Sequence, residues 1–148
     1  MNNINFPKPT TLPQVLSIDE FKGNAGGQKF QAILTDAKKH KIIDILPSRT
    51  QTNLMIYLNE FKNKIDVRYF IMDMNYVYRD IALSYLPKAK IVIDRFHVVH
   101  YVIWALKNVR KRIQKDMYPS KRRYFKRSRR ILLSHYCKLN SESKEPIL

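Results

Sequence analysis

Three apolar segments of this sequence each end in an aspartate, and these aspartates are the first candidates for chemistry. They are Asp19, Asp73 and Asp94. Ligands of open α/β sheets bind just outside the carboxyl ends of the strands, so Asp19 and Asp73 would converge there if their strands were parallel neighbours. Converging carboxylates repel unless a proton or a cation neutralises them, and hard oxygen ligands suit Mg²⁺ or Mn²⁺. Two such ions about 4 Å apart can support phosphodiester cleavage by activating water and stabilising the leaving oxygen.

The same aspartates also have a purely structural interpretation. Aspartate often follows a strand because it favours turns and caps helices. Asp73, directly before an expected helix, would fit that role alone. Three such residues in an order that clusters them favour a metal site only modestly, so the residues by themselves leave both interpretations open.

The hydrophobic pattern around the aspartates predicts a mixed sheet covered by helices. Short apolar runs predict strands at residues 15–18, 30–34, 42–46, 69–72 and 91–93. Apolar residues spaced three and four apart predict helices at about 50–61, 75–86, 97–115 and 120–137. Thr50 or Thr52 is expected to cap the first helix, and Pro87 to stop the second. The order is β-β-β-α-β-α-β followed by basic helices, an α/β class whose order an RNase H-like fold requires.

One apolar stripe falls on the expected helix at 97–115. It comprises Val98, Tyr101, Trp104 and Leu106. Apolar side chains at helical spacing are usually buried, so we expect this stripe to lie in the core.

The charge of the chain is strongly basic and unevenly distributed. The sequence has 28 Lys and Arg against 12 Asp and Glu, a net charge of +16. Residues 1–100 hold 14 basic and 9 acidic residues, whereas residues 101–148 hold 14 and 3. A basic surplus at one end indicates a polyanionic partner. No apolar run approaches the roughly 20 residues that span a bilayer, and the N-terminus lacks a signal peptide's apolar region. We therefore expect nucleic acid, not a membrane.

Basic residues on the last two expected helices are the predicted phosphate contacts. They are Arg110, Lys111, Arg112, Lys121, Arg122, Arg123, Lys126, Arg127, Arg129 and Arg130. A solvated helix face is the structural alternative, but this density does not fit on one face of each helix. The single cysteine, Cys137, excludes an internal disulfide and a multi-cysteine zinc site, in keeping with a cytoplasmic location.

Two stretches resemble the ISL-three family of insertion-sequence transposases. Residues 71–74 read Ile-Met-Asp-Met, and residues 85–98 read Tyr-Leu-Pro-Lys-Ala-Lys-Ile-Val-Ile-Asp-Arg-Phe-His-Val. In that family an Asp-Met pair closes a strand, and a Pro-x-Ala segment precedes an Asp-Arg-Phe-His-Val box. Residues 18–21, Ile-Asp-Glu-Phe, resemble the first acidic motif, and residues 105–110 and 122–133 add further similarity.

The resemblance implies a DDE-type, RNase H-like domain that binds Mg²⁺ or Mn²⁺ and cuts and joins DNA during transposition. By position, Asp19 would be the first acidic ligand and Asp73 the second, with Asp94 a competitor for the second role. Arg95 and His97, in the box, would contact DNA. Transposon ends and target DNA would be the partners, and the location would be the cytoplasm of a bacterium, associated with the nucleoid. Homo-oligomerisation would belong to the full-length parent.

The resemblance also predicts an incomplete enzyme. The family's third acid, usually Glu, lies beyond the basic helices, and no residue here matches it. We expect residues 1–13 to be a leader or linker and residues 14–118 a partial catalytic domain. Residues 119–148 would be a basic helical segment that begins a truncated insertion or C-terminal region. A non-enzymatic basic nucleic-acid-binding module is the alternative, and an intact RNase H-type nuclease would need another acid.

Overall fold

The element order observed in the structure, a computed structural model, is that of a mixed α/β protein. The structure describes residues 9–23, 27–127, 133–134 and 136–138. Its strands are β1 Val15–Lys22, β2 Phe30–Asp36, β3 Lys41–Leu46, β4 Tyr69–Met72 and β5 Lys90–Ile93. Its α-helices are α1 Gln51–Asn59, α2 Tyr76–Tyr85, α3 Arg95–Lys115 and α4 Pro119–Arg127, and its 3-10 helices are η2 Lys64–Asp66 and η3 Tyr136–Lys138. The predicted order of strands and helices is confirmed.

The five strands form one sheet in the order β3-β2-β1-β4-β5. The hairpin strands β1, β2 and β3 pair antiparallel, as the short connections between them allow. β4 pairs parallel with both β1 and β5. The strands that carry Asp19 and Asp73 are therefore parallel neighbours in the middle of the sheet.

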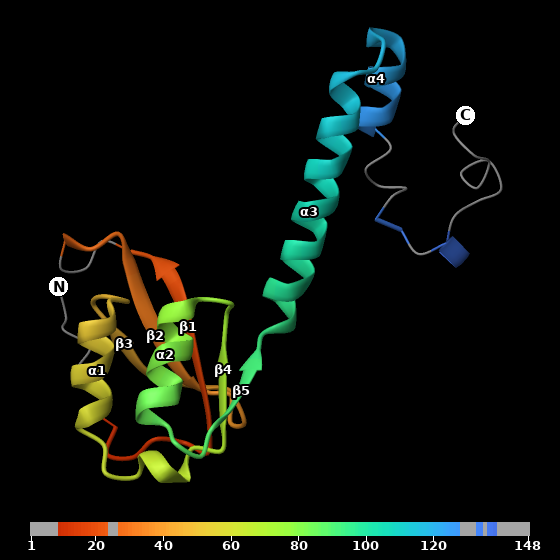
Figure 1. Cartoon of the computed structure of the whole chain (residues 1–148). Helices are drawn as coiled ribbons and strands as arrows, with labels where there is room; N and C mark the ends of the chain where they lie inside the picture. The colour runs from red at the N-terminus through yellow and green to blue at the C-terminus, as the bar shows by residue number, and fades with distance from the viewer. Residues whose placement is uncertain (1–8, 24–26, 128–132, 135, 139–148) are drawn as a thin grey trace. The chain divides into compact units, whose positions relative to one another are not determined.

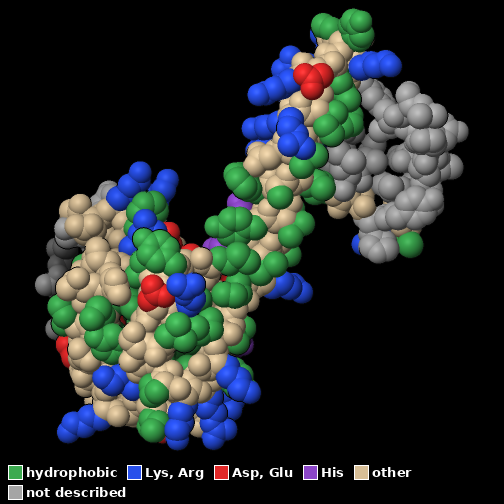
Figure 2. Space-filling view, viewed as in Figure 1, with side chains coloured by type: hydrophobic (Ala, Val, Ile, Leu, Met, Phe, Trp, Pro, Cys, Tyr) green, Lys and Arg blue, Asp and Glu red, His purple; other side chains and the backbone are tan. Residues whose placement is uncertain are grey.

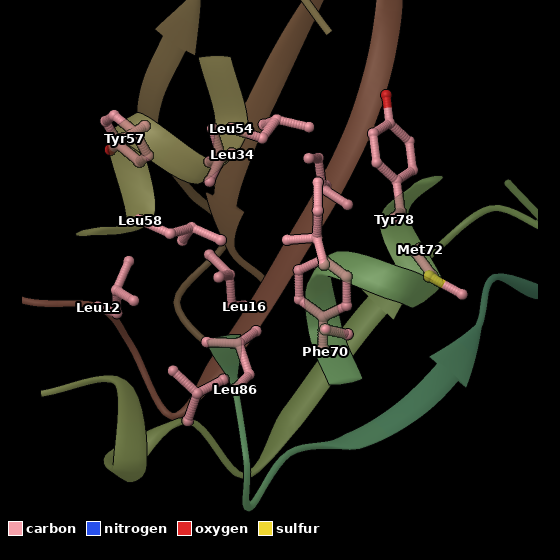
Figure 3. Close-up of a cluster of buried hydrophobic side chains, with 14 of the residues drawn as sticks. Leu12, Leu16, Leu34, Leu54, Tyr57, Leu58, Phe70, Met72, Tyr78 and Leu86 are labelled. Carbon is pink, nitrogen blue, oxygen red and sulfur yellow. The ribbon is translucent and has the colours of Figure 1, made fainter. Parts of the chain in front are cut away.

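The hydrophobic core lies between one face of the sheet and helices α1 and α2. Both helices cover the same face, as Figure 1 shows. Successive side chains of a strand point to opposite faces, so alternate residues reach the core. Leu16 of β1 and Phe70 of β4 are paired neighbours there and are 0% and 1% exposed. They pack with Leu54 of α1 and Tyr78 of α2 (Figure 3).

Strand β1 is longer than predicted and runs past Asp19 to Lys22. Its antiparallel pairing with β2 extends from Leu16 to Lys22, whereas its parallel pairing with β4 ends at Ser17. The apolar pattern marked only the part of β1 that lies against the core. Asp19 is thus inside a strand, at the place where β4 has ended and β2 continues as the neighbour.

The start of α1 also differs in detail from the prediction. Thr50 occupies the N-cap position, but its side chain makes no capping hydrogen bond. Its backbone N–H instead donates to Ser48 Oγ at 3.2 Å. α2 agrees with the prediction, since it ends at Tyr85 ahead of Pro87.

The chain divides into two compact units, residues 1–97 and 98–148. In the second unit, Arg110 Nη1 of α3 donates to the backbone oxygen of Lys126 of α4 at 3.0 Å. The prediction that the stripe of Val98, Tyr101, Trp104 and Leu106 lies in a core is wrong. All four side chains are exposed, and Trp104 keeps 56% of its surface accessible. Helical periodicity identified the apolar side of α3 but could not supply an element to cover it.

The buried position of Phe70 predicts a large loss of stability on truncation. Phe70→Ala should lower the free energy of unfolding by about 3–5 kcal/mol, because it removes a buried ring and leaves a cavity. Urea unfolding followed by circular dichroism measures the change. The matched control is Ile56→Ala on α1, where the side chain is 60% exposed and the expected loss is below about 1 kcal/mol. Equal losses in the two variants would contradict the described core.

Candidate functional site

The three candidate aspartates lie on the three adjacent parallel strands β1, β4 and β5. Ser17 of β1 pairs with Ile71 of β4, and Met72 of β4 pairs with Ile93 of β5. The same register, continued past the last paired residues, sets Asp19 beside Asp73 and Asp73 beside Asp94. Because side chains alternate along a strand, this register assigns all three positions to the face opposite the core. The charge of Asp19 is among those that raise the pKa of Asp73, so these two carboxylates lie within electrostatic reach of each other.

The hydrogen bonds of Asp73 and Asp94 separate their roles. Asp94 immediately precedes α3, and its Oδ1 accepts the N–H of Phe96 at 2.9 Å, a helix-capping contact. Asp73 does not cap α2: that helix is capped by Asn75, whose Oδ1 accepts the N–H of Val77 at 3.0 Å. Asp73 Oδ1 accepts the N–H of Asn75 at 2.9 Å and so organises the turn before the helix. Helix capping therefore explains the presence of Asp94 at its position, whereas Asp73 has no capping role.

The electrostatic surroundings of Asp73 connect it to Asp19. Partial burial raises the pKa of Asp73. The hydrogen bond from Asn75 and the charge of His97 lower that pKa, whereas the charges of Glu20 and Asp19 raise it. The carboxylate therefore lies within electrostatic reach of two other acids and is partly shielded from water. Carboxylates held this way bind a cation more readily than isolated ones do.

Two carboxylates with hard oxygen donors are the ligand type that Mg²⁺ and Mn²⁺ prefer. Asp19 is exposed and Asp73 is half-buried, so both are open to a ligand from the solvent side. Among the described residues, no group of three or more His, Cys, Asp or Glu side chains is arranged to hold a metal ion. The carboxylate oxygens of Asp19 and Asp73 are suitable ligands for a divalent ion, but such an ion would need further ligands besides these two side chains.

Sequence reasoning missed a group of side chains on the core side of β1. Glu20 accepts a hydrogen bond from Arg49 Nη1, and the two side chains form an ion pair. The Tyr78 hydroxyl lies 3.4 Å from Glu20 Oε2 and donates to it. The guanidinium of Arg49 also lies over the ring of Phe30, 4.5 Å from its centroid. Glu20 belongs to the Ile-Asp-Glu-Phe motif, but nothing local in the sequence indicates its distant partners.

The predicted DNA-contacting residues fall mainly on α3 and α4. Figure 2 shows Lys and Arg side chains along both helices. The exposed members on α3 and α4 are Arg95, Lys111, Arg112, Lys121, Arg122, Arg123 and Lys126. Arg110 is half-buried by its contact with α4, and His97 lies near Asp73. The side chain of Arg127 and all of Arg129 and Arg130 lie outside the described residues. Within the described part of the chain, no helix is both long enough and apolar enough to span a membrane.

The raised pKa of Asp73 has a consequence for stability. A carboxyl with a raised folded-state pKa binds its proton more tightly in the folded chain, so its stabilising contribution is lost as the pH rises through that pKa. Asp73→Asn, which stays neutral, should therefore raise the Tm at pH 7, and the gain should shrink as the pH is lowered. Thermal unfolding across pH measures this, with exposed Asp66→Asn as the control. A lower Tm for Asp73→Asn at pH 7 would contradict the electrostatic picture.

Comparison with known proteins assigns the family. Residues 16–147 match the model of a transposase family, the ISL-three type of DDE transposases. A search of curated proteins gave no match. The matched region includes Asp19, Asp73, the Asp-Arg-Phe-His-Val box and both basic helices. The chain belongs to the ISL-three family of DDE transposases.

Proposed function

We propose that Asp19 and Asp73 form the two-carboxylate part of a metal-dependent centre for cutting and joining DNA. One observation supports this proposal: β1 and β4 pair in parallel up to Ser17 and Ile71, and each aspartate follows two residues after that last pair on its own strand segment. Membership of a transposase family supports DNA phosphodiesters as the substrate. The sheet order β3-β2-β1-β4-β5, with two helices on one face, supports an RNase H-like domain.

The chain's own residues would bind and orient what the reaction needs. Bound Mg²⁺ or Mn²⁺ would activate the attacking oxygen and stabilise the leaving oxygen of the phosphodiester. Asn75 fixes Asp73 through Oδ1, which leaves the other carboxylate oxygen to face a ligand. Glu20 N–H likewise donates to Asp19 Oδ1 at 2.7 Å. Both aspartates are thus held by backbone N–H groups, an arrangement suited to a preorganised site.

The reaction that this centre would serve is an in-line displacement at phosphorus. A water oxygen would attack first, breaking one P–O bond and releasing a DNA 3′-hydroxyl. That hydroxyl would then lose its proton and attack a target phosphodiester, whose own 3′-oxygen leaves and is protonated. With a two-acid site, we propose that the chain alone binds metal and DNA without turning over. A plasmid-nicking assay with Mn²⁺ should show no cleavage above background. Robust nicking that is lost in Asp19→Ala would refute the proposed inactivity.

The basic helices would bind the DNA backbone without reading its sequence. Their exposed Lys and Arg side chains match phosphate groups, whose contacts position a protein but carry no sequence information. This feature alone also favours the second candidate function, a nucleic-acid-binding module without metal chemistry. The two candidates differ in whether the aspartates bind a divalent ion.

Metal binding separates the candidates. Asp19→Asn and Asp73→Asn should each weaken Mn²⁺ binding about ten-fold or more, measured by calorimetric titration or by the Mn²⁺ electron spin resonance signal. Asp94→Asn is the matched control, since Asp94 caps α3, and its effect should stay within about three-fold. Absence of Mn²⁺ binding by the unaltered chain would leave the binding-module function. A loss in Asp94→Asn equal to that in Asp73→Asn would move the second ligand to Asp94.

Salt dependence tests the basic helices. The triple variant Lys121→Ala, Arg122→Ala, Arg123→Ala should bind duplex DNA more weakly whatever its sequence. Its slope of log affinity against log salt should be shallower by about 2.7, because each neutralised phosphate contributes about 0.9. Fluorescence anisotropy at several salt concentrations measures the slope. The control removes three basic residues near the β2–β3 turn, Lys38, Lys39 and Lys41, and should leave the slope unchanged. Affinity that did not vary with salt would rule out phosphate contacts.

A further inference from the structure

The stretch of β1 that carries Asp19 lacks support from β4. Parallel pairing ends at Ser17 and Ile71, and from there on the neighbour of β1 is β2 alone. Asp19 itself is exposed. A carboxylate ligand must keep its distance from the second carboxylate, so the backbone at Asp19 needs another constraint on its β4 side.

The side chain of Glu20 connects this part of β1 to other segments of the fold. It follows Asp19 directly, and its side chain points to the opposite face, so it can be held without occupying the face of the candidate metal ligands. Its carboxylate pairs with Arg49, in the link between β3 and α1, and accepts a hydrogen bond from Tyr78 of α2. Arg49 in turn stacks on Phe30 at the start of β2.

The hydrogen bond from Tyr78 to Glu20 connects the segment after Asp73 to the segment after Asp19. α2 begins shortly after Asp73, and its cap Asn75 is hydrogen-bonded to Asp73. The same helix then reaches across to Glu20 through the Tyr78 hydroxyl. The backbone after Asp73 and the backbone after Asp19 are therefore joined by α2. In the described part of the chain, β1 has no backbone pairing with β4 beyond Ser17, and the hydrogen bond from Tyr78 to Glu20 connects β1 to α2 in that region.

The network combines a partly exposed ion pair with one buried hydrogen-bond donor. Tyr78 is 1% exposed, and the side chains of Glu20 and Arg49 are 24% and 40% exposed. Burial and the charge of Glu20 raise the pKa of Tyr78 well above its ordinary value, so the hydroxyl stays protonated and can donate. The hydrogen bond to Glu20 raises the pKa of Arg49, which keeps its charge. A hydrogen-bonded charge pair of this kind holds its geometry better than two exposed chains do.

We propose that Arg49 and Tyr78 are positioning residues that act through Glu20 to fix the spacing of Asp19 and Asp73. The inference rests on the proposed metal-binding function and adds residues that the two-carboxylate site does not contain.

The test compares substitutions that remove or keep the cation at position 49. Arg49→Met removes the charge, Arg49→Lys keeps it, and Tyr78→Phe removes only the hydroxyl. Lys39→Met is the matched control, because it removes one exposed cation that pairs with Asp36 at the end of β2, away from Glu20. Each full-length variant is measured for Mn²⁺ affinity, for amide hydrogen exchange in residues 19–22, and for Tm.

Arg49→Met should weaken Mn²⁺ binding about ten-fold or more, the usual size of effect for partners of metal ligands. It should also speed exchange of the amides in residues 19–22 while leaving the amides of β4 unchanged. Arg49→Lys should recover the affinity to within a few-fold, and Tyr78→Phe should fall between the unaltered chain and Arg49→Met. Lys39→Met should leave both affinity and exchange unchanged.

Two results would overturn the proposal. The first is unaltered Mn²⁺ affinity and exchange in Arg49→Met. The second is a loss that Arg49→Lys does not recover and that follows the Tm across all variants, which would show a structural role only. If the unaltered chain binds no Mn²⁺, the proposed function fails by itself. The exchange of residues 19–22 then decides whether Glu20, Arg49 and Tyr78 hold β1.

Discussion

The parallel pairing of β1 with β4 is the interaction on which the rest of the structure depends. It joins segments far apart in the chain, and the connection between β3 and β4 passes through α1, as parallel strands require. Its register decides where the carboxylates lie. A slip of one residue would turn Asp19 and Asp73 to opposite faces. Burial of Leu16 and Phe70 against the helices resists such a slip, so the core also fixes the site.

The two faces of the sheet differ in the side chains that they carry. One face is covered by α1 and α2 and provides the apolar burial, whereas the other carries the aspartates. Charged side chains would be costly inside the core, and the alternation of side chains along the strands keeps these aspartates off the core face. Partial burial raises the pKa of Asp73, and the charges of Glu20 and Asp19 add to that rise. Sites arranged for binding commonly carry such a cost.

The two units of the chain have complementary chemistry for a polyanionic substrate. Acidic side chains gather at the carboxyl end of the parallel strands in residues 1–97, while the exposed cations of α3 and α4 belong largely to residues 98–148. Carboxylates attract the divalent ions that phosphodiester chemistry uses, and the cations attract the phosphates themselves. Membership of a transposase family implies DNA as the partner of the chain.

Local periodicity and residue type were enough to predict the order of strands and helices, the end of α2 ahead of Pro87 and the basic surplus. The sequence also carried the motifs of the family. The local pattern could not predict that β1 continues past Asp19, that Glu20 pairs with Arg49, or that Trp104 is exposed. Each of these depends on what a distant segment does. A local pattern specifies which side of an element is apolar or charged, but the packing partner comes from the folded chain.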